Sequence, residues 1–175
     1  MKKDLRYRYI QKWTRQARES EDPYDVFICF WTAMTITAQI DRLKLKMHHK
    51  EEDTNREKIF DYFVKNKQEV FQVLKKNRDI MLKLIEMEGP KYKDPIIDTG
   101  DPALRNRFNE LVLYYHGKIP TFSQKRMAEN MAELVSRARY SIFRTTEIPD
   151  VEYDKALLQL LNPLLSDIVK VTTGY

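Results

Sequence analysis

The chain has 175 residues and a single cysteine, Cys29, which excludes an intramolecular disulfide and favours a reducing compartment. Charged residues make up 33% of a chain with only four glycines, a composition typical of helical proteins, and the formal charge is +5. The longest apolar run, residues 26–40, is too short to cross a bilayer of about 30 Å. We therefore expect one all-α domain over residues 1–175, a compact bundle of about six to seven helices in the cytoplasm, with no membrane span.

Residues 1–20 are predicted to form a basic amphipathic helix. One arc of the helical wheel is apolar and is expected to pack inward; it contains Leu5, Tyr9, Ile10, Trp13 and Ala17. The segment also holds the entire net charge of the chain, since it carries Lys2, Lys3, Arg6, Arg8, Lys12, Arg15 and Arg18 against Asp4 and Glu19. Two interpretations of Arg8, Lys12 and Arg15 stay open: they contact nucleic-acid phosphates, or they form a solvated basic face.

The next segments predict three further helices. Pro23 is a helix-start signal, and a helix from Pro23 to about Met47 is apolar nearly all round in its first half, as expected of a central helix with Cys29 buried. Thr54 and Glu57 have the spacing of a capping box and predict the start of a third helix. A fourth is expected from near Asn66, with an apolar stripe as far as Ile85 and with Gly89 and Pro90 as its stop.

Residues 88–102 hold two of the four glycines and three of the seven prolines, which predicts a long loop. A helix from about Ala103 to His116 should follow, with Gly117 as its stop. A long helix is predicted from Gln124 to about Phe143. The last helix is expected to be capped by Asp150 and to be kinked or restarted at Pro163.

Three features invite a functional interpretation. The adjacent His48 and His49 precede acidic residues 51–53, but neighbours on a helix point about 100° apart, so we expect no metal site. His116 suits the end of a helix, where the dipole favours a cation. An apolar stripe in the long helix fits either the core or a dimer seam; it contains Met127, Met131, Leu134, Ala138 and Ile142.

The segment from Leu134 to Val169 resembles the signature region of the HEPN superfamily of RNA-associated helical proteins. Arg139, Ser141 and Arg144 fall on the family's pattern of an arginine, a spacer with a polar residue, and a histidine. Pro149 and Asp150 continue the pattern into the last helix. Upstream, residues 22–39 and 54–74 resemble the second and third helices of the same proteins, so the resemblance covers most of the chain from Pro23 onward.

The resemblance implies a homodimer in which Arg and His of both subunits line a cleft that cuts RNA without a metal or another cofactor. Histidine suits this reaction because it accepts a proton near pH 7, and arginine stabilises the charge that grows on phosphate. In this chain Arg144 stands in place of the histidine, and a guanidinium does not release its proton. Thr145 also replaces the usual glycine. Arg137, Arg139 and Arg144 still suit phosphate binding.

These residues predict a catalytically degenerate, HEPN-like dimer that binds RNA or a regulatory partner such as a cognate antitoxin, in a toxin–antitoxin or defence setting. One alternative is an active, metal-independent endoribonuclease whose base is His116 or another residue outside the motif. A second alternative is a purely structural helical interaction module. The missing histidine favours a protein that is not an enzyme.

Overall fold

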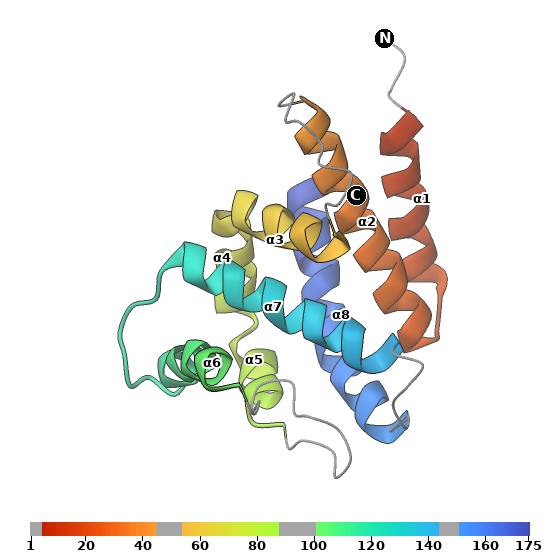
Figure 1. Cartoon of the computed structure of the whole chain (residues 1–175). Coiled ribbons are helices and arrows are strands. Elements are labelled where there is room, and N and C mark those ends of the chain that lie inside the picture. Colours follow the sequence, from red (N-terminus) through yellow and green to blue (C-terminus); the bar gives the residue numbers. More distant parts are fainter. Residues whose placement is uncertain (1–4, 45–53, 88–100, 144–150) are drawn as a thin grey trace.

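The computed structural model describes residues 5–44, 54–87, 101–143 and 151–175, which form eight α-helices and no strand (Figure 1). The helices are α1 (Leu5–Glu19), α2 (Pro23–Lys44), α3 (Asn55–Lys65), α4 (Lys67–Lys76), α5 (Arg78–Ile85), α6 (Pro102–Tyr115), α7 (Gln124–Phe143) and α8 (Val151–Thr173). The predicted all-α class is therefore confirmed. His48, His49, Arg144 and Asp150 lie outside the described residues, as do residues 88–100 of the expected loop.

Local signals set the ends of several helices as predicted. The Thr54 side chain accepts from the amide of Glu57, whose carboxylate accepts from the amide of Thr54, so the capping box is confirmed. Asp101 caps α6 ahead of Pro102, which occupies the first helical position, where a missing N–H costs nothing. Gly117 ends that helix with φ of 72°, a left-handed conformation that suits glycine.

One prediction about helix continuity is wrong, and one of the two alternatives at Pro163 is excluded. The single helix expected to begin near Asn66 is broken at Asn77, whose side-chain amide donates to the carbonyl of Val73 at 2.9 Å and to Asp167 at 3.2 Å. Such side-chain bonds to the backbone compete with the helical path. Pro163, by contrast, does not restart α8, which continues through it as one helix to Thr173.

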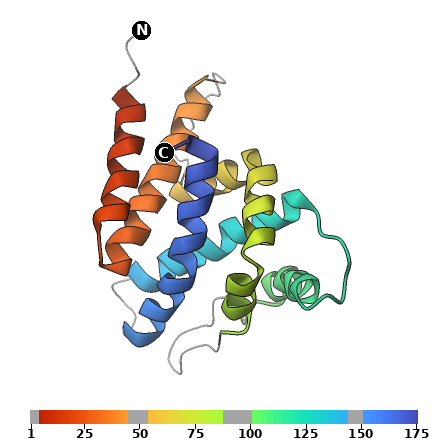
Figure 2. The same cartoon turned by 180° about the vertical axis from the view of Figure 1, so that it is seen from behind.

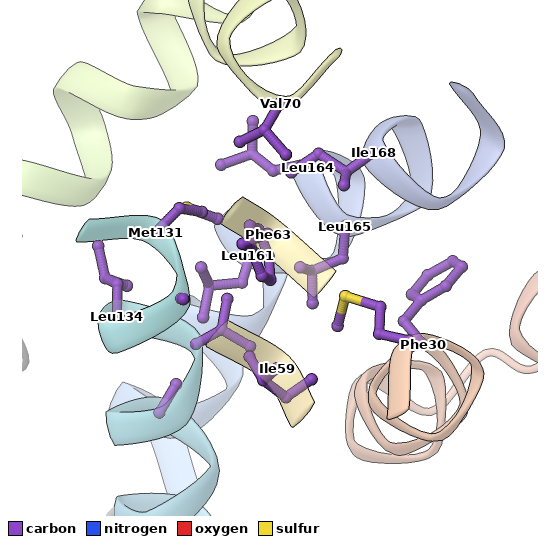
Figure 3. Packing of buried hydrophobic residues seen from close by; sticks show 14 of the residues in the cluster. Phe30, Ile59, Phe63, Val70, Met131, Leu134, Leu161, Leu164, Leu165 and Ile168 are labelled. Atoms are coloured by element: carbon purple, nitrogen blue, oxygen red, sulfur yellow. The ribbon is translucent and has the colours of Figure 1, made fainter. Parts of the chain in front are cut away.

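Helix α8 lies at the centre of the bundle. It contacts α2, α4, α5 and α7, and Figure 2 shows it from behind with α2 on one side and α4 on the other. Its buried stripe includes Leu161, Leu164, Leu165 and Ile168, which meet side chains of α2, α3, α4 and α7 (Figure 3). Each such side chain stabilises the fold by about 1.5–3 kcal/mol when it leaves water.

The apolar stripe of α7 belongs to this core. Met127, Met131, Leu134 and Ala138 are all buried within the single chain, and Ile142 is partly buried against the same cluster. A dimer seam requires side chains that a second copy can reach. The stripe is therefore mainly core, and Ile142 at its end is the one of these five residues that stays partly accessible.

Helix α1 packs antiparallel along α2 (Figure 1). The face that α1 buries against α2 is narrower than the predicted apolar arc. Ile10, Thr14 and Ala17 are buried. The buried hydroxyl of Thr14 donates a hydrogen bond to the carbonyl of Ile10 at 2.9 Å. Leu5 and Tyr9 are 67% and 52% exposed, so their predicted inward packing is wrong. At 100° per residue they point about 100–140° away from Ile10, beyond the reach of α2.

No described helix combines the length and apolar character that crossing a bilayer requires. The most apolar candidate of the sequence, residues 26–40, is the core-facing part of α2. Phe27, Phe30, Met34 and Ala38 from this run are buried against other helices of the chain.

Replacement of Leu161 by alanine should lower the free energy of unfolding by about 2–5 kcal/mol, because Leu161 is fully buried and its loss leaves a cavity in the centre of the core. Leu113, which is 43% exposed on α6, provides the matched control, and Leu113→Ala should change stability by less than about 0.5 kcal/mol. Urea unfolding followed by circular dichroism measures both. Equal effects of the two substitutions would contradict the described core.

Stability should also fall at alkaline pH because of two buried tyrosines. Tyr62 bonds with the Thr172 hydroxyl, and the Tyr115 hydroxyl donates to the carbonyl of Leu74 at 3.2 Å. Burial raises the pKa of both phenols, so the native state favours their protonated forms. Their contribution is intact below the unfolded-state pKa of about 10 and is lost above it, by up to about 1.4 kcal/mol per pH unit for each tyrosine.

Urea midpoints measured at neutral and alkaline pH test this dependence. The double variant Tyr62→Phe/Tyr115→Phe should show a shallower decline than the wild-type chain above pH 10. Parallel declines would mean that other groups cause the alkaline loss.

Candidate nucleic-acid interface

The last turns of α7 carry the part of the predicted motif that the structure describes. Arg139 and Ser141 lie in this helix, whereas Arg144 lies beyond its described end. The predicted pairing of Arg139 with Arg144 therefore has no described geometry. What the structure does define is the surroundings of Arg139.

Arg139 lies against aromatic rings from two helices. Its guanidinium carbon is 5.3 Å from the ring centre of Trp31 in α2 and 5.7 Å from that of Phe143 in α7. Phe143 is held in turn by Phe27, which stacks on it at 6.1 Å, and by the edge of Tyr24 at 6.3 Å. These contacts fix the plane of the guanidinium through cation–π attraction.

Unlike two other arginines of the bundle, Arg139 has no carboxylate partner in the described part of the chain. Arg42 pairs with Asp61, and Arg56 pairs with Glu133 at 2.6 Å. The Nε atom of Arg139, in contrast, is buried and has no hydrogen-bond acceptor. A cation that loses water without gaining a counter-charge is costly, and ring faces compensate only part of that cost.

Ser136 is a second unsatisfied donor on the same side of α7, which sequence reasoning missed. Its Oγ is buried without a partner, and it lies one turn before Arg139, about 60° away on the helix. The only signal in the sequence was the spacing of three residues from Arg139. Both unsatisfied donors, Oγ of Ser136 and Nε of Arg139, are therefore buried beside one another on α7.

The other predicted positions of α7 do not join this group. Arg137 and Ser141 lie two residues on either side of Arg139, about 160° away around the helix. Both are partly buried and have interactions of their own. They point to the side opposite Trp31, so the structure brings neither of them to Arg139.

The cations of α1 form a separate feature. Arg8, Lys12 and Arg15 are exposed on the side of α1 that faces away from its buried residues. Arg15 lies 3.9 Å from Glu19, and Lys12 lies over the ring of Trp13 at 5.8 Å. Arg139 lies against Trp31 of α2 and not among these cations of α1. A ligand that contacts both Arg139 and the α1 cations must therefore extend from one site to the other.

His116 lies far from Arg139 within one chain. It caps α6 with its Nε2 atom 3.6 Å from Glu86, and the neighbouring Tyr115 reaches Met127 in the first turn of α7. Arg139 follows Met127 along the same helix by about 18 Å at 1.5 Å per residue. His116 is therefore not placed to act as a base beside Arg139 in the same subunit.

A hollow of about 730 Å³ lies where α2 and α8 begin, next to the end of α7. Three carboxylates line it, those of Glu21, Asp22 and Asp154, with Lys155 as the one described cation. The pKa of Tyr24 at its edge is raised by burial first and then by Asp154 and Asp22. The acidic lining repels phosphate, so this hollow does not extend the Arg139 site.

Among the residues with described positions, no three His, Cys, Asp or Glu side chains gather closely enough to hold a metal ion. The pair His48 and His49 falls outside that set. The described part of the Arg139 site holds a cation fixed on two aromatic rings, a group whose donors match the geometry of oxyanions.

Arg139→Met should leave the free energy of unfolding within about 1 kcal/mol of the wild-type value, or raise it, because an apolar chain of similar length replaces a cation without a described acid partner. The control is Arg42→Met, which removes a nearly buried arginine from Asp61 and should cost about 1.5–3 kcal/mol. Chemical denaturation measures both. A larger loss for Arg139→Met than for Arg42→Met would mean that Arg139 is structural.

Comparisons with protein-family models, with curated proteins and with solved structures gave no match to this chain. The resemblance to HEPN proteins accordingly stays a prediction from the sequence motifs. The all-helical fold confirms the predicted fold class and does not test that resemblance.

Proposed function

We propose that this protein binds RNA through a backbone phosphate at Arg139 and does not cleave it through the degenerate motif. The proposal combines the sequence resemblance around Arg139 with the surroundings of its side chain. The observation that carries it is the guanidinium fixed on Trp31 and Phe143 without a described carboxylate partner.

A phosphate supplies what Arg139 lacks. Its oxygens accept hydrogen bonds from a guanidinium in a geometry that matches the planar fork of donors, and its charge offsets the loss of water around the cation. Ser136 adds a hydroxyl donor on the same side of the helix. A buried donor without an acceptor costs free energy, and a bound oxyanion would offset that cost.

The rings beside Arg139 hold the guanidinium and do not stack on bases. Trp31 is only 7% exposed, and Phe143 is engaged with Phe27 and Tyr24. Base recognition by stacking needs an accessible ring face. We therefore expect contacts with the RNA backbone that depend weakly on base sequence.

The absence of cleavage follows from the residues available to move a proton. Arg144 occupies the motif position of the base and stays protonated at physiological pH. His116 lies near the other end of α7. Loss of general acid–base catalysis typically lowers a rate by about 10²–10⁴.

We further propose that the protein works as a homodimer with a regulatory role, in the toxin–antitoxin or defence setting that the resemblance implies. Tyr140 and Val151 are 58% and 50% exposed and flank the end of α7 and the start of α8, which supports contact with a second copy or an antitoxin there. The buried thiol of Cys29 suits a reducing cytoplasm.

Mobility shifts on a single-stranded RNA test the proposal. Arg139→Met should weaken binding by about tenfold, since a charge-assisted bond to phosphate contributes about 1.5–3 kcal/mol. Lys125→Met removes one charge from the exposed start of the same helix and should bind like the wild type. Equal affinity of the wild type and Arg139→Met, or no shift at low salt, would contradict the proposal and favour a structural module.

The contribution of α1 is measured by salt titration. If Arg8, Lys12 and Arg15 contact phosphates, the triple glutamine variant should reduce the slope of log affinity against log salt by about 2, at about 0.7 for each contact with a single strand. An unchanged slope would assign these exposed cations to a solvated face.

A cleavage assay separates binding from catalysis. The wild type should leave structured RNA intact, and the restored Arg144→His variant should be the more active of the two. Wild-type cleavage that disappears in Arg139→Met would establish the enzyme alternative and overturn the proposed lack of activity.

A further inference from the structure

A second hollow, of about 320 Å³, lies between α6 and α7 and is lined almost wholly by polar side chains. Helix α6 contributes Arg107 and Glu110, and α7 contributes Arg126, Glu129 and Asn130. Residues three and four apart share one face of a helix, so two polar stripes face each other here. Facing helices of a bundle ordinarily fill such a position with apolar side chains.

Asn130 is the buried polar group of this hollow. It is 1% exposed, and its Oδ1 atom has no hydrogen-bond donor. Its Nδ2 atom donates to the carbonyl of Arg107 at 3.5 Å, and a reversed amide would place Oδ1 against that carbonyl oxygen. Asn130 therefore lines the hollow and carries a buried acceptor that lacks an N–H or O–H partner.

The charges around the hollow are balanced. Arg126 pairs with Glu110 across the two helices at 2.6 Å, and Glu129 lies 3.7 Å from Lys125. Arg107, at the exposed rim, has no acid partner among the described residues. An anion would meet both glutamates and a cation would meet both arginines, whereas a ligand with one charge of each sign finds a partner for each.

We propose that this hollow binds a free α-amino acid as its zwitterion. The carboxylate pairs with the guanidinium of Arg107, for which a planar oxyanion is the matching partner. The ammonium group has three donors, of which one satisfies Oδ1 of Asn130 and another faces Glu129. The site is independent of the phosphate contact proposed for Arg139, so either proposal can fail without the other.

Calorimetric titration of the full chain with a panel of standard free amino acids tests the assignment. At least one should bind saturably, and its N-acetyl and its C-terminal amide derivatives should each bind at least about tenfold more weakly, because each lacks one of the two charges. No binding by any amino acid at millimolar concentration would overturn the proposal. Equal binding of the blocked derivatives would do the same.

Two substitutions in the hollow and two outside it locate the site. Arg107→Gln at the exposed rim and Asn130→Leu at the buried base should each weaken binding by at least about tenfold. Asn162→Leu removes another buried amide whose Oδ1 lacks a partner, and Arg105→Gln removes an exposed arginine of α6; both should bind like the wild type. Since Arg107 is exposed, its variant tests the site even if Asn130→Leu fails to fold. Full binding by Arg107→Gln would refute the proposal.

Discussion

The burial of α8 is the constraint on which the rest of the bundle depends. Its leucines are buried in the core cluster, and the helix contacts α2 on one side and α4, α5 and α7 on the other. Because a helix with an apolar stripe is unstable in water without a covering surface, α8 determines where the other helices can lie. The position of α7 on this core in turn brings Arg139 to Trp31.

The two candidate binding regions share one physical feature. At Arg139 and Ser136, and again at Asn130, α7 buries polar atoms that have no partner in the described chain. Unsatisfied polar atoms are uncommon in native interiors because each costs about 1–3 kcal/mol. They occur in the first and second halves of one long helix, on different faces, so the two proposed ligands would bind apart from one another.

Local chemistry in the sequence predicted much of the fold. The capping box at Thr54, the glycine at 117 and the limits of α7 depend on residues close together in the chain, and all agree with the structure. The break at Asn77 was missed because its side chain bonds to Asp167, which is distant in sequence. Leu5 and Tyr9 were placed inward because a helical wheel shows an apolar arc but not which part of that arc a neighbour covers.

The candidate site was predictable only in part, for the same reason. The motif singles out Arg139, but its ring partner Trp31 is contributed by a helix more than a hundred residues earlier. No periodicity in the sequence relates the two. Ser136 and Asn130 carry no motif at all, and they become notable only when the structure shows that their polar atoms are buried and unpaired.

The central position of α8 has a consequence for the synthesis of the protein. The helices that surround it are translated first, and the parts of their apolar faces that pack on α8 stay uncovered until residues as far as Thr173 have left the ribosome. A nascent chain that ends before α8 therefore exposes the part of the core that α8 covers. Such an intermediate is the kind that chaperones bind, and a pause in translation within the last helix would prolong its exposure.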